Sequence, residues 1–224
     1  MSKNSGLFSS SLGKKYLMAI TGLFLCSFLI IHFLGNVALF TDPVQFNEYT
    51  RFMSSNPIIR VMEIVLVVGF LTHIIDAIML TRANKKAQPV KYAMNKNKSS
   101  WYSRNMGLTG SVILAFLILH LQSFWFEYKF GEVLMTVDSN GDEIKDMYTI
   151  VKTAFSDWWY SAIYILAMIL LGSHLNHGFQ SAFQSVGLRH KKYTPTIEML
   201  GTGFSISITL GFISFPVYFL IIQL

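Results

Sequence analysis

The chain is poor in charged residues. Asp, Glu, Lys and Arg make up only 13% of its 224 residues, whereas hydrophobic residues make up 52% and aromatic residues 15%. Ordinary soluble domains contain roughly 25% charged residues. The composition therefore excludes an ordinary soluble domain and predicts a membrane protein.

Cysteine is almost absent as well. The single cysteine, Cys26, lies within a long apolar stretch. One thiol can form neither a disulfide within the chain nor a thiolate metal cluster. If the protein binds a metal, histidine is therefore the expected ligand.

Apolar runs, in contrast, are long and frequent. Five of them can cross a hydrocarbon core of ~30 Å, which takes ~20 helical residues; they cover about 16–40, 58–81, 106–126, 158–183 and 199–222. The first exceeds the ~7 to 15 apolar residues of a signal peptide, so we expect it to be retained. The sequence predicts an all-α, polytopic membrane protein, with residues 1–224 as a single transmembrane domain of five helices.

The net charge of +6 is divided unevenly between the connections. The connection from Arg82 to Arg104 holds seven basic residues and no acid, whereas residues 127–157 hold seven acids against three lysines. Basic residues also precede the first span and separate the fourth span from the fifth. The positive-inside rule then places the N-terminus in the cytoplasm and the C-terminus outside. Topology explains the charge, and we expect no nucleic-acid partner.

The acidic connection contains one turn signal. Asn140-Gly141 separates two short apolar runs, a pattern typical of a type I′ β-hairpin. We expect a small external flap with no role in the chemistry.

Five of the six histidines lie within the predicted spans, where an unpaired imidazole is costly. Each could hydrogen-bond a neighbouring helix or serve a function. At ~1.5 Å per residue, His32 and His120 lie about 26 and 24 Å from the cytoplasmic edge, and His73 about 14 Å from it. His174 also approaches the cytoplasmic end of its helix. The depths predict an outer pair, His32 with His120, and an inner pair, His73 with His174.

An internal similarity supports the outer pair. The stretches TGLFLCSFLIIH (Thr21 to His32) and TGSVILAFLILH (Thr109 to His120) share Thr-Gly, Phe-Leu-Ile and a final His at the same spacing. The inner pair shows a weaker similarity, since a hydroxyl residue precedes each histidine: Thr72 precedes His73 and Ser173 precedes His174.

Two imidazoles at one depth on different helices suit the axial positions of a b-type haem, and a four-helix bundle of helices 1–4 can enclose it. Small residues near the ligands would let a macrocycle approach the backbone, or would serve helix packing; they are Gly22, Gly35, Gly69, Gly110, Gly172 and Gly178. Zinc is a weaker candidate because it gathers four ligands at one point.

A proton relay is the other alternative, although relays more often include buried carboxylates. The spans contain only two acids, Glu63 and Asp76. Asp76 lies one turn beyond His73 and could hold its imidazole or reach for the membrane surface.

These features resemble a known family. The first-span motif, "NPI" ahead of His73, one histidine on each of helices 3 and 4, and HLNHGFQSAFQSVG at the end of helix 4 are similar to the di-haem cytochrome b membrane anchor of succinate dehydrogenase/fumarate reductase. The resemblance covers nearly the whole chain. It implies that His73 and His174 hold the proximal haem iron, and that His32 and His120 hold the distal haem iron.

The resemblance also implies a function and partners. The chain would be the non-flavin membrane subunit of a succinate:quinone oxidoreductase in a bacterial inner membrane. It would pass electrons through two b haems between an iron–sulfur subunit and menaquinone. A flavoprotein subunit, also on the cytoplasmic face, would interconvert succinate and fumarate.

Further site residues follow from the same family pattern. Glu48 is the expected proton-transfer group at the quinone site, with Glu63 as the alternative; both could also be ordinary loop charges. Arg82 and Arg189 could neutralise haem propionates or dock the iron–sulfur subunit, although topology alone explains them.

The fourth ligand is a choice between two histidines. The family pattern places it four residues before a glycine, which selects His174 ahead of Gly178. His177 is then expected near a haem propionate, and it is the ligand if His174 is not.

Two rival functions stay open. Another di-haem cytochrome b, such as the membrane subunit of a hydrogenase or formate dehydrogenase, would share the haem ligands but not the soluble partner. A haem-free transporter would use the histidines as a proton relay.

Overall fold

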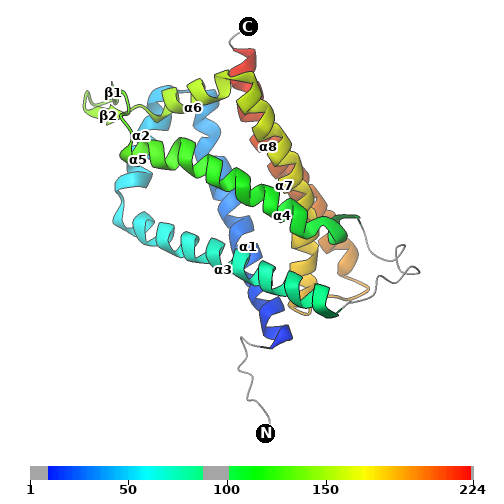
Figure 1. Ribbon diagram of the computed structural model, residues 1–224. Coiled ribbons are helices and arrows are strands. Elements are labelled where there is room, and N and C mark those ends of the chain that lie inside the picture. Colours follow the sequence, from blue (N-terminus) through cyan, green and yellow to red (C-terminus); the bar gives the residue numbers. More distant parts are fainter. Residues whose placement is uncertain (1–9, 88–100, 223–224) are drawn as a thin grey trace.

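Five long helices dominate the computed structural model, which describes residues 10–87 and 101–222 (Figure 1). They are α1 (Ser11–Asn36), α3 (Pro57–Ala87), α4 (Trp101–His120), α7 (Trp158–Ser185) and α8 (Thr194–Ile221). All five are long and apolar enough to cross a membrane. The predicted all-α, polytopic fold is confirmed.

Polar ends extend these helices beyond their apolar stretches. α1 begins at Ser11 because the hydroxyl of Ser10 accepts a hydrogen bond from the Gly13 N–H at 3.0 Å. α3 continues to Ala87, with Lys85 and Lys86 in its last turn, where positive charge is favourable to the helix dipole. Apolar runs mark the part of a helix that suits lipid, whereas caps and charges decide where it ends.

The long helices pack in a defined order. α1 lies between α3 and α7, and α4 packs mainly on α7. α8 covers α7 from the other side and also touches α1, while α3 and α4 barely touch each other. In Figure 1, α3 and α4 slant across the more upright α1, α7 and α8. The first four membrane helices are thus neighbours in the order α3, α1, α7, α4.

The end of α4 departs from regular α-helix. It passes directly into a π-helical segment, Leu121–Phe126, and then into α5 (Glu127–Phe130). π-Helical turns are rare and often accompany functional positions. Here the wider turn begins immediately after His120.

The end of the bundle where α8 finishes is covered by α2 (Pro43–Ser55), α6 (Met147–Ser156) and a hairpin of β1 (Met135–Val137) and β2 (Glu143–Lys145) (Figure 1). We call this end the C-terminal end, and the end where α1 begins the N-terminal end. We call α2, α6 and the hairpin together the cap. A cluster of buried aromatic residues joins the cap to the long helices; it includes Phe155, Tyr160, Tyr164 and Phe219.

The sequence analysis did not anticipate α2 or α6, although both carry start signals. Asp42 caps α2 ahead of Pro43, and Asp146 caps α6. Asn47, only 2% exposed, joins the two helices. Its Nδ2 donates to Asp146 Oδ1 at 2.9 Å, and its Oδ1 accepts from the Tyr148 N–H at 2.8 Å. Burial acts to raise the pKa of Asp146, but hydrogen bonds led by those from Thr149 and Asn47 outweigh it and hold the pKa below its usual range.

The predicted hairpin is confirmed, but its predicted type I′ turn is wrong. A type I′ turn needs positive φ at both central residues; only Gly141 has it, at 87°, and no described non-glycine residue does. The Asp138 N–H donates to the Asp142 carbonyl at 2.9 Å, closing a three-residue loop. The Asp138 carboxylate accepts the N–H groups of Asn140 and Asp142, both at 2.9 Å, and so stabilises the longer loop.

Charge separates along the bundle axis. Exposed basic residues at the starts and ends of α1, α3 and α7 gather at the N-terminal end; they include Lys15, Arg82, Lys85, Lys86 and Arg189. The acids of the hairpin lie at the C-terminal end. Lys3, Lys91, Lys96 and Lys98, also counted in the topology prediction, lie outside the described residues.

Candidate functional site

The outer histidines meet near the C-terminal end. His32 lies one turn before the end of α1, and His120 is the last residue of α4. Their ring centroids are 5.7 Å apart and the rings are nearly perpendicular, at 89°. Phe28 stacks on His32 at 5.3 Å, and Phe124 meets the edge of His120 at 5.3 Å. The pair is therefore lined by aromatic rings.

The inner histidines meet nearer the N-terminal end. His73 lies in the middle of α3, and His174 lies past the middle of α7. Their ring centroids are 6.5 Å apart and the rings cross at 67°. Four histidines from four helices thus form two pairs at two levels, the pairing that the helix depths predicted.

The separation within each pair suits one metal ion between two imidazoles. Metal–imidazole bonds of about 2 Å put two coordinated rings roughly 6 Å apart, centre to centre. Among the described residues, no group of three or more His, Cys, Asp or Glu side chains could hold a metal ion alone. A haem needs only two axial ligands from the protein. The donor set therefore fits two bis-histidine haems, and iron ligation by these residues stays a prediction.

Three of the four histidines have a partner at Nδ1. The Thr21 hydroxyl lies 3.1 Å from His73 Nδ1, and the Tyr164 hydroxyl lies 3.4 Å from His120 Nδ1. Asn36 Nδ2 is 3.5 Å from His32 Nδ1 and donates to the His32 carbonyl at 2.7 Å. The hydroxyls of Thr21 and Tyr164 can accept from Nδ1–H, which leaves Nε2 of those rings free for a metal. The Asn36 NH₂ group can only donate, so it cannot be the acceptor of a His32 Nδ1–H.

His174 differs from the other three. Its Nδ1 is buried and has no hydrogen-bond partner among the described residues. Its ring nonetheless faces His73. His177 instead lines a pocket of about 150 Å³ at the N-terminal end, together with Arg189 and Glu198. The structure therefore gives His174 and His177 separate surroundings and brings the predicted propionate partners His177 and Arg189 together.

Of the six glycines that could border a haem or serve helix packing, three are not explained by contacts within the protein: Gly22, Gly110 and Gly178. A Cβ atom at Gly22 would lie 3.5 Å from His73 Cε1, and one at Gly110 would lie 3.6 Å from His174 Cε1. At Gly178 the nearest atom would be Met106 Cε, also at 3.6 Å. All three are ordinary van der Waals contacts, so the protein itself has room for alanine at these positions.

Other glycines serve helix packing. A Cβ atom at Gly69 would lie 2.9 Å from the Phe24 ring, and one at Gly35 would lie 2.5 Å from the Tyr49 hydroxyl. A Cβ atom at Gly172 would lie even closer to the Thr209 hydroxyl. At these positions the packing alternative accounts for the glycine.

Glu48 lies in the cap. Its Oε1 accepts hydrogen bonds from the Ser139 N–H at 2.8 Å and from the Ser139 hydroxyl at 2.5 Å. With Arg51 and Asp138 it lines a polar pocket of about 270 Å³ between α2 and the hairpin. Arg51 donates to Asp138 Oδ2 at 2.9 Å. The contacts of Glu48 in the structure hold the hairpin against α2.

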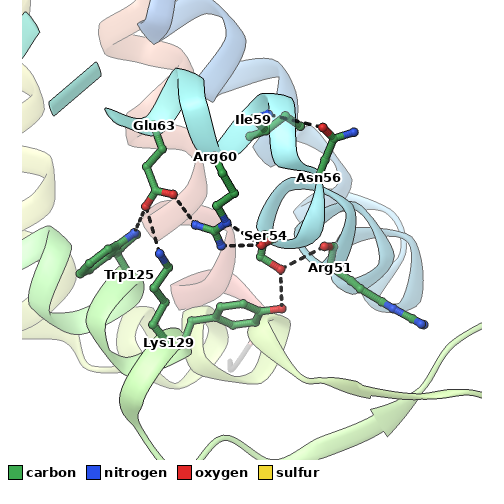
Figure 2. Close-up of polar contacts among 9 residues, drawn as sticks. Arg51, Ser54, Asn56, Ile59, Arg60, Glu63, Trp125 and Lys129 are labelled. Carbon is green, nitrogen blue, oxygen red and sulfur yellow. Dashed lines mark hydrogen bonds and ion pairs between the residues drawn. The ribbon is translucent and has the colours of Figure 1, made fainter. Parts of the chain in front are cut away.

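Glu63 is held by residues of the segment that follows His120 (Figure 2). Its carboxylate accepts from Trp125 Nε1 at 2.6 Å, from Lys129 Nζ at 3.3 Å and from Arg60. Trp125 belongs to the π-helical segment that follows His120. Arg60 also donates from Nε to the Ser54 carbonyl at 2.7 Å. This cluster joins the start of α3 to the π-helical segment and α5 that follow α4, while α3 and α4 themselves barely touch.

Asp76 neither bonds His73 nor reaches solvent. It is 1% exposed, and both carboxylate oxygens lack a hydrogen-bond partner among the described residues. Arg82, in contrast, is exposed near the end of α3. Both sequence-based alternatives for Asp76 are wrong, because the helix turns its side chain inward.

Sequence reasoning missed Tyr164 and the roles of Thr21 and Trp125. Tyr164 is 5% exposed and its hydroxyl shares a 3.0 Å hydrogen bond with Tyr160. A buried polar group in a span is the signal that could have identified it. Which helix it faces depends on helix packing, which one span does not reveal.

Comparison with known proteins adds no relative: no family model, curated protein or solved structure matches the chain. The geometry of the two histidine pairs is therefore the ground on which a function is proposed.

Proposed function

We propose that this protein is the membrane-anchor cytochrome b subunit of a succinate dehydrogenase/fumarate reductase. The observation that carries the proposal is the pairing of His73 with His174 and of His32 with His120, with ring centres 6.5 and 5.7 Å apart. Four helices supply the four rings, and the pairs lie at two levels along the bundle. Two redox centres at two depths suit electron transfer between a partner at one membrane face and a quinone nearer the other.

Each histidine pair would hold one b haem. When bound, the haem iron carries single electrons by alternating between its ferric and ferrous states. The chain itself would ligate the iron through Nε2, orient the rings through the Nδ1 contacts and exclude water with the surrounding aromatic side chains. Gly22, Gly110 and Gly178 would leave room for the macrocycle.

The N-terminal end would face the cytoplasm of a bacterial inner membrane, with the C-terminus outside. The positive-inside rule and the basic residues at that end support this orientation. His177 and Arg189 share one pocket there and would neutralise haem propionates. Exposed Arg82 would help to dock the iron–sulfur subunit, which connects to the flavoprotein.

Menaquinone would react near the outer pair, where it needs a group that transfers protons. Glu48 is the residue that the family pattern selects. Glu63 is the alternative, and its bond to Trp125, five residues after His120, favours it by position. Comparing quinone-dependent turnover in Glu48→Gln and Glu63→Gln tests the choice: loss in only one variant, with haem content unchanged, identifies the residue.

Haem content and selective haem loss test the central proposal. A pyridine haemochrome assay on the purified protein should give about two b haems per chain. His32→Ala and His120→Ala should each remove the same haem, whereas His73→Ala and His174→Ala should each remove the other. His177→Ala is the matched control and should keep both. A protein without haem would refute the proposal and favour the transporter.

Co-purification separates the proposal from its closest rival. Recovery with a flavoprotein and an iron–sulfur subunit, and succinate-dependent reduction of the haems, supports the proposal. Recovery with a hydrogenase or formate dehydrogenase and no flavoprotein would instead assign the chain to another class of di-haem cytochrome b.

A further inference from the structure

The two Thr-Gly dipeptides of the internal repeat occupy related places in the fold. Thr21-Gly22 lies on α1, which packs on α3, and Thr109-Gly110 lies on α4, which packs on α7. Gly22 faces His73, and Gly110 faces His174, at nearly equal distances of 3.5 and 3.6 Å from Cβ to Cε1. The repeat that ends in the outer histidines thus begins beside the inner ones.

Thr21 shows what the threonine of this dipeptide does. Its hydroxyl donates to the Leu17 carbonyl at 2.8 Å and lies 3.1 Å from His73 Nδ1. A hydroxyl has one proton and two lone pairs. The Leu17 carbonyl is the nearer acceptor for that proton, and with the proton directed there the hydroxyl would accept from His73 Nδ1–H. That arrangement would keep the proton on Nδ1 and leave Nε2 free to bind a metal.

The Thr109 hydroxyl can accept a hydrogen bond, and Nδ1 of His174 has no acceptor among the described residues. Thr109 is 3% exposed and its hydroxyl donates to the Met106 carbonyl at 3.1 Å, which leaves its lone pairs free. His174 Nδ1 is buried without a partner among the described residues, and it lies 4.0 Å from the Cβ position of Gly110. In this structure the Thr109 hydroxyl is not within hydrogen-bond distance of His174 Nδ1, but Thr109 is the counterpart of Thr21 in the repeat and adjoins Gly110, which faces this ring.

We propose that Thr21 and Thr109 are equivalent positioning residues of the inner site: with haem bound, Thr21 accepts the Nδ1–H of His73 and Thr109 accepts that of His174, so that each histidine presents Nε2 to the haem iron. This inference rests on the proposed function, since it assigns roles at the inner haem. Accepting a hydrogen bond from Nδ1–H makes an imidazole a more basic ligand. A more basic ligand favours ferric iron, so both threonines hold the midpoint potential of the inner haem down.

The experiment is a redox titration of both haems in membranes that contain the full-length protein, followed by absorbance and by the low-spin electron paramagnetic resonance signals. The variants are Thr21→Val and Thr109→Val, which remove the hydroxyl at similar volume, and Thr109→Ser, which restores it. Ser111→Ala is the matched control, because Ser111 is exposed on α4 and donates only to the Gly107 carbonyl at 2.8 Å.

Both valine variants should raise the potential of the inner haem and leave that of the outer haem unchanged. Thr109→Ser and Ser111→Ala should match the unmodified protein. A wild-type inner potential in Thr109→Val would overturn the role of Thr109. If Thr109→Val loses the inner haem, retention of that haem by Thr109→Ser supports the proposal, and its loss from both overturns it. An unmodified protein without haem refutes the proposed function itself, a result distinct from two haems with unshifted potentials.

Discussion

Gly110 can distinguish a haem site from a helix-packing contact. In Gly110→Ala the added methyl group would lie 3.6 Å from His174 Cε1, an ordinary contact distance. Alanine is more favourable than glycine inside a helix by about 1 kcal/mol. If protein contacts were all that mattered, this variant would be as stable as the unmodified protein, or more stable by up to about 1 kcal/mol.

A haem packed against this backbone changes the expectation. The methyl group would then occupy space needed by the macrocycle, so the purified variant should contain about one haem per chain in place of two, the inner haem being lost. Thermal unfolding in detergent, without added haem, should show no loss of stability. The pyridine haemochrome ratio and the unfolding midpoint are measured on the same sample.

Gly69→Ala is the matched control, one turn before His73 on α3. Its methyl group would lie 2.9 Å from the Phe24 ring, so Phe24 must move. Overpacking costs about 1 to 3 kcal/mol, and the gain in helix propensity offsets about 1 kcal/mol of it. We expect a loss of stability of up to about 2 kcal/mol with both haems retained. Two haems with unchanged spectra in Gly110→Ala would refute the clearance argument.

Three further predictions concern the outer half of the protein. Tyr164→Phe removes the hydroxyl 3.4 Å from His120 Nδ1, so a redox titration should show a higher potential for the outer haem only; a shift in the inner haem would contradict this. Glu63→Gln weakens charge-assisted hydrogen bonds between α3 and the segment after α4 and should cost about 1 to 2 kcal/mol of stability; an unchanged unfolding midpoint would refute that link. Asn47→Ala removes a hydrogen bond to Asp146 and the acceptor of the Tyr148 N–H, and should lower the free energy of unfolding by about 2 kcal/mol.

The stability contributed by Asp146 should depend on pH. Its pKa is lower in the folded protein than in the unfolded chain, so the contribution is complete above the unfolded pKa of about 3.9. It is lost as the pH falls through the lower folded pKa. Unfolding midpoints of the unmodified protein and Asp146→Asn should therefore converge in acid; a gap that stays constant down to low pH would contradict the argument.

Much of this architecture was readable from local patterns. Apolar length alone predicted five membrane helices, because a hydrocarbon core requires a minimum span whatever the fold. The rise of about 1.5 Å per helical residue converts sequence spacing into depth in the membrane, and the depths predicted which histidines lie at the same level. The hairpin was also predicted, whereas its turn type was not, because the Asp138 carboxylate stabilises a longer loop than Asn140-Gly141 alone would favour.

Other features depended on contacts between distant segments. The two short helices of the cap have start signals at Asp42 and Asp146. They are held together, however, by the hydrogen bonds of Asn47, which lies 99 residues from its partner Asp146 in the sequence. Glu48 and Glu63 could not be ranked from spacing, since their hydrogen-bond partners come from the hairpin and from the turn after α4.

The sequence by itself determined the number of membrane helices, the two histidine levels and the uneven charge, since each follows from hydrophobic length, helix rise or loop composition. Only the tertiary structure decided which ring faces which, which glycines are required by packing, and that Thr21 contacts His73 whereas the Nδ1 atom of His174 has no partner in the described part of the chain. Those properties depend on the rotation of each helix about its axis. That rotation is set by the side chains of neighbouring helices, and no single helix specifies it.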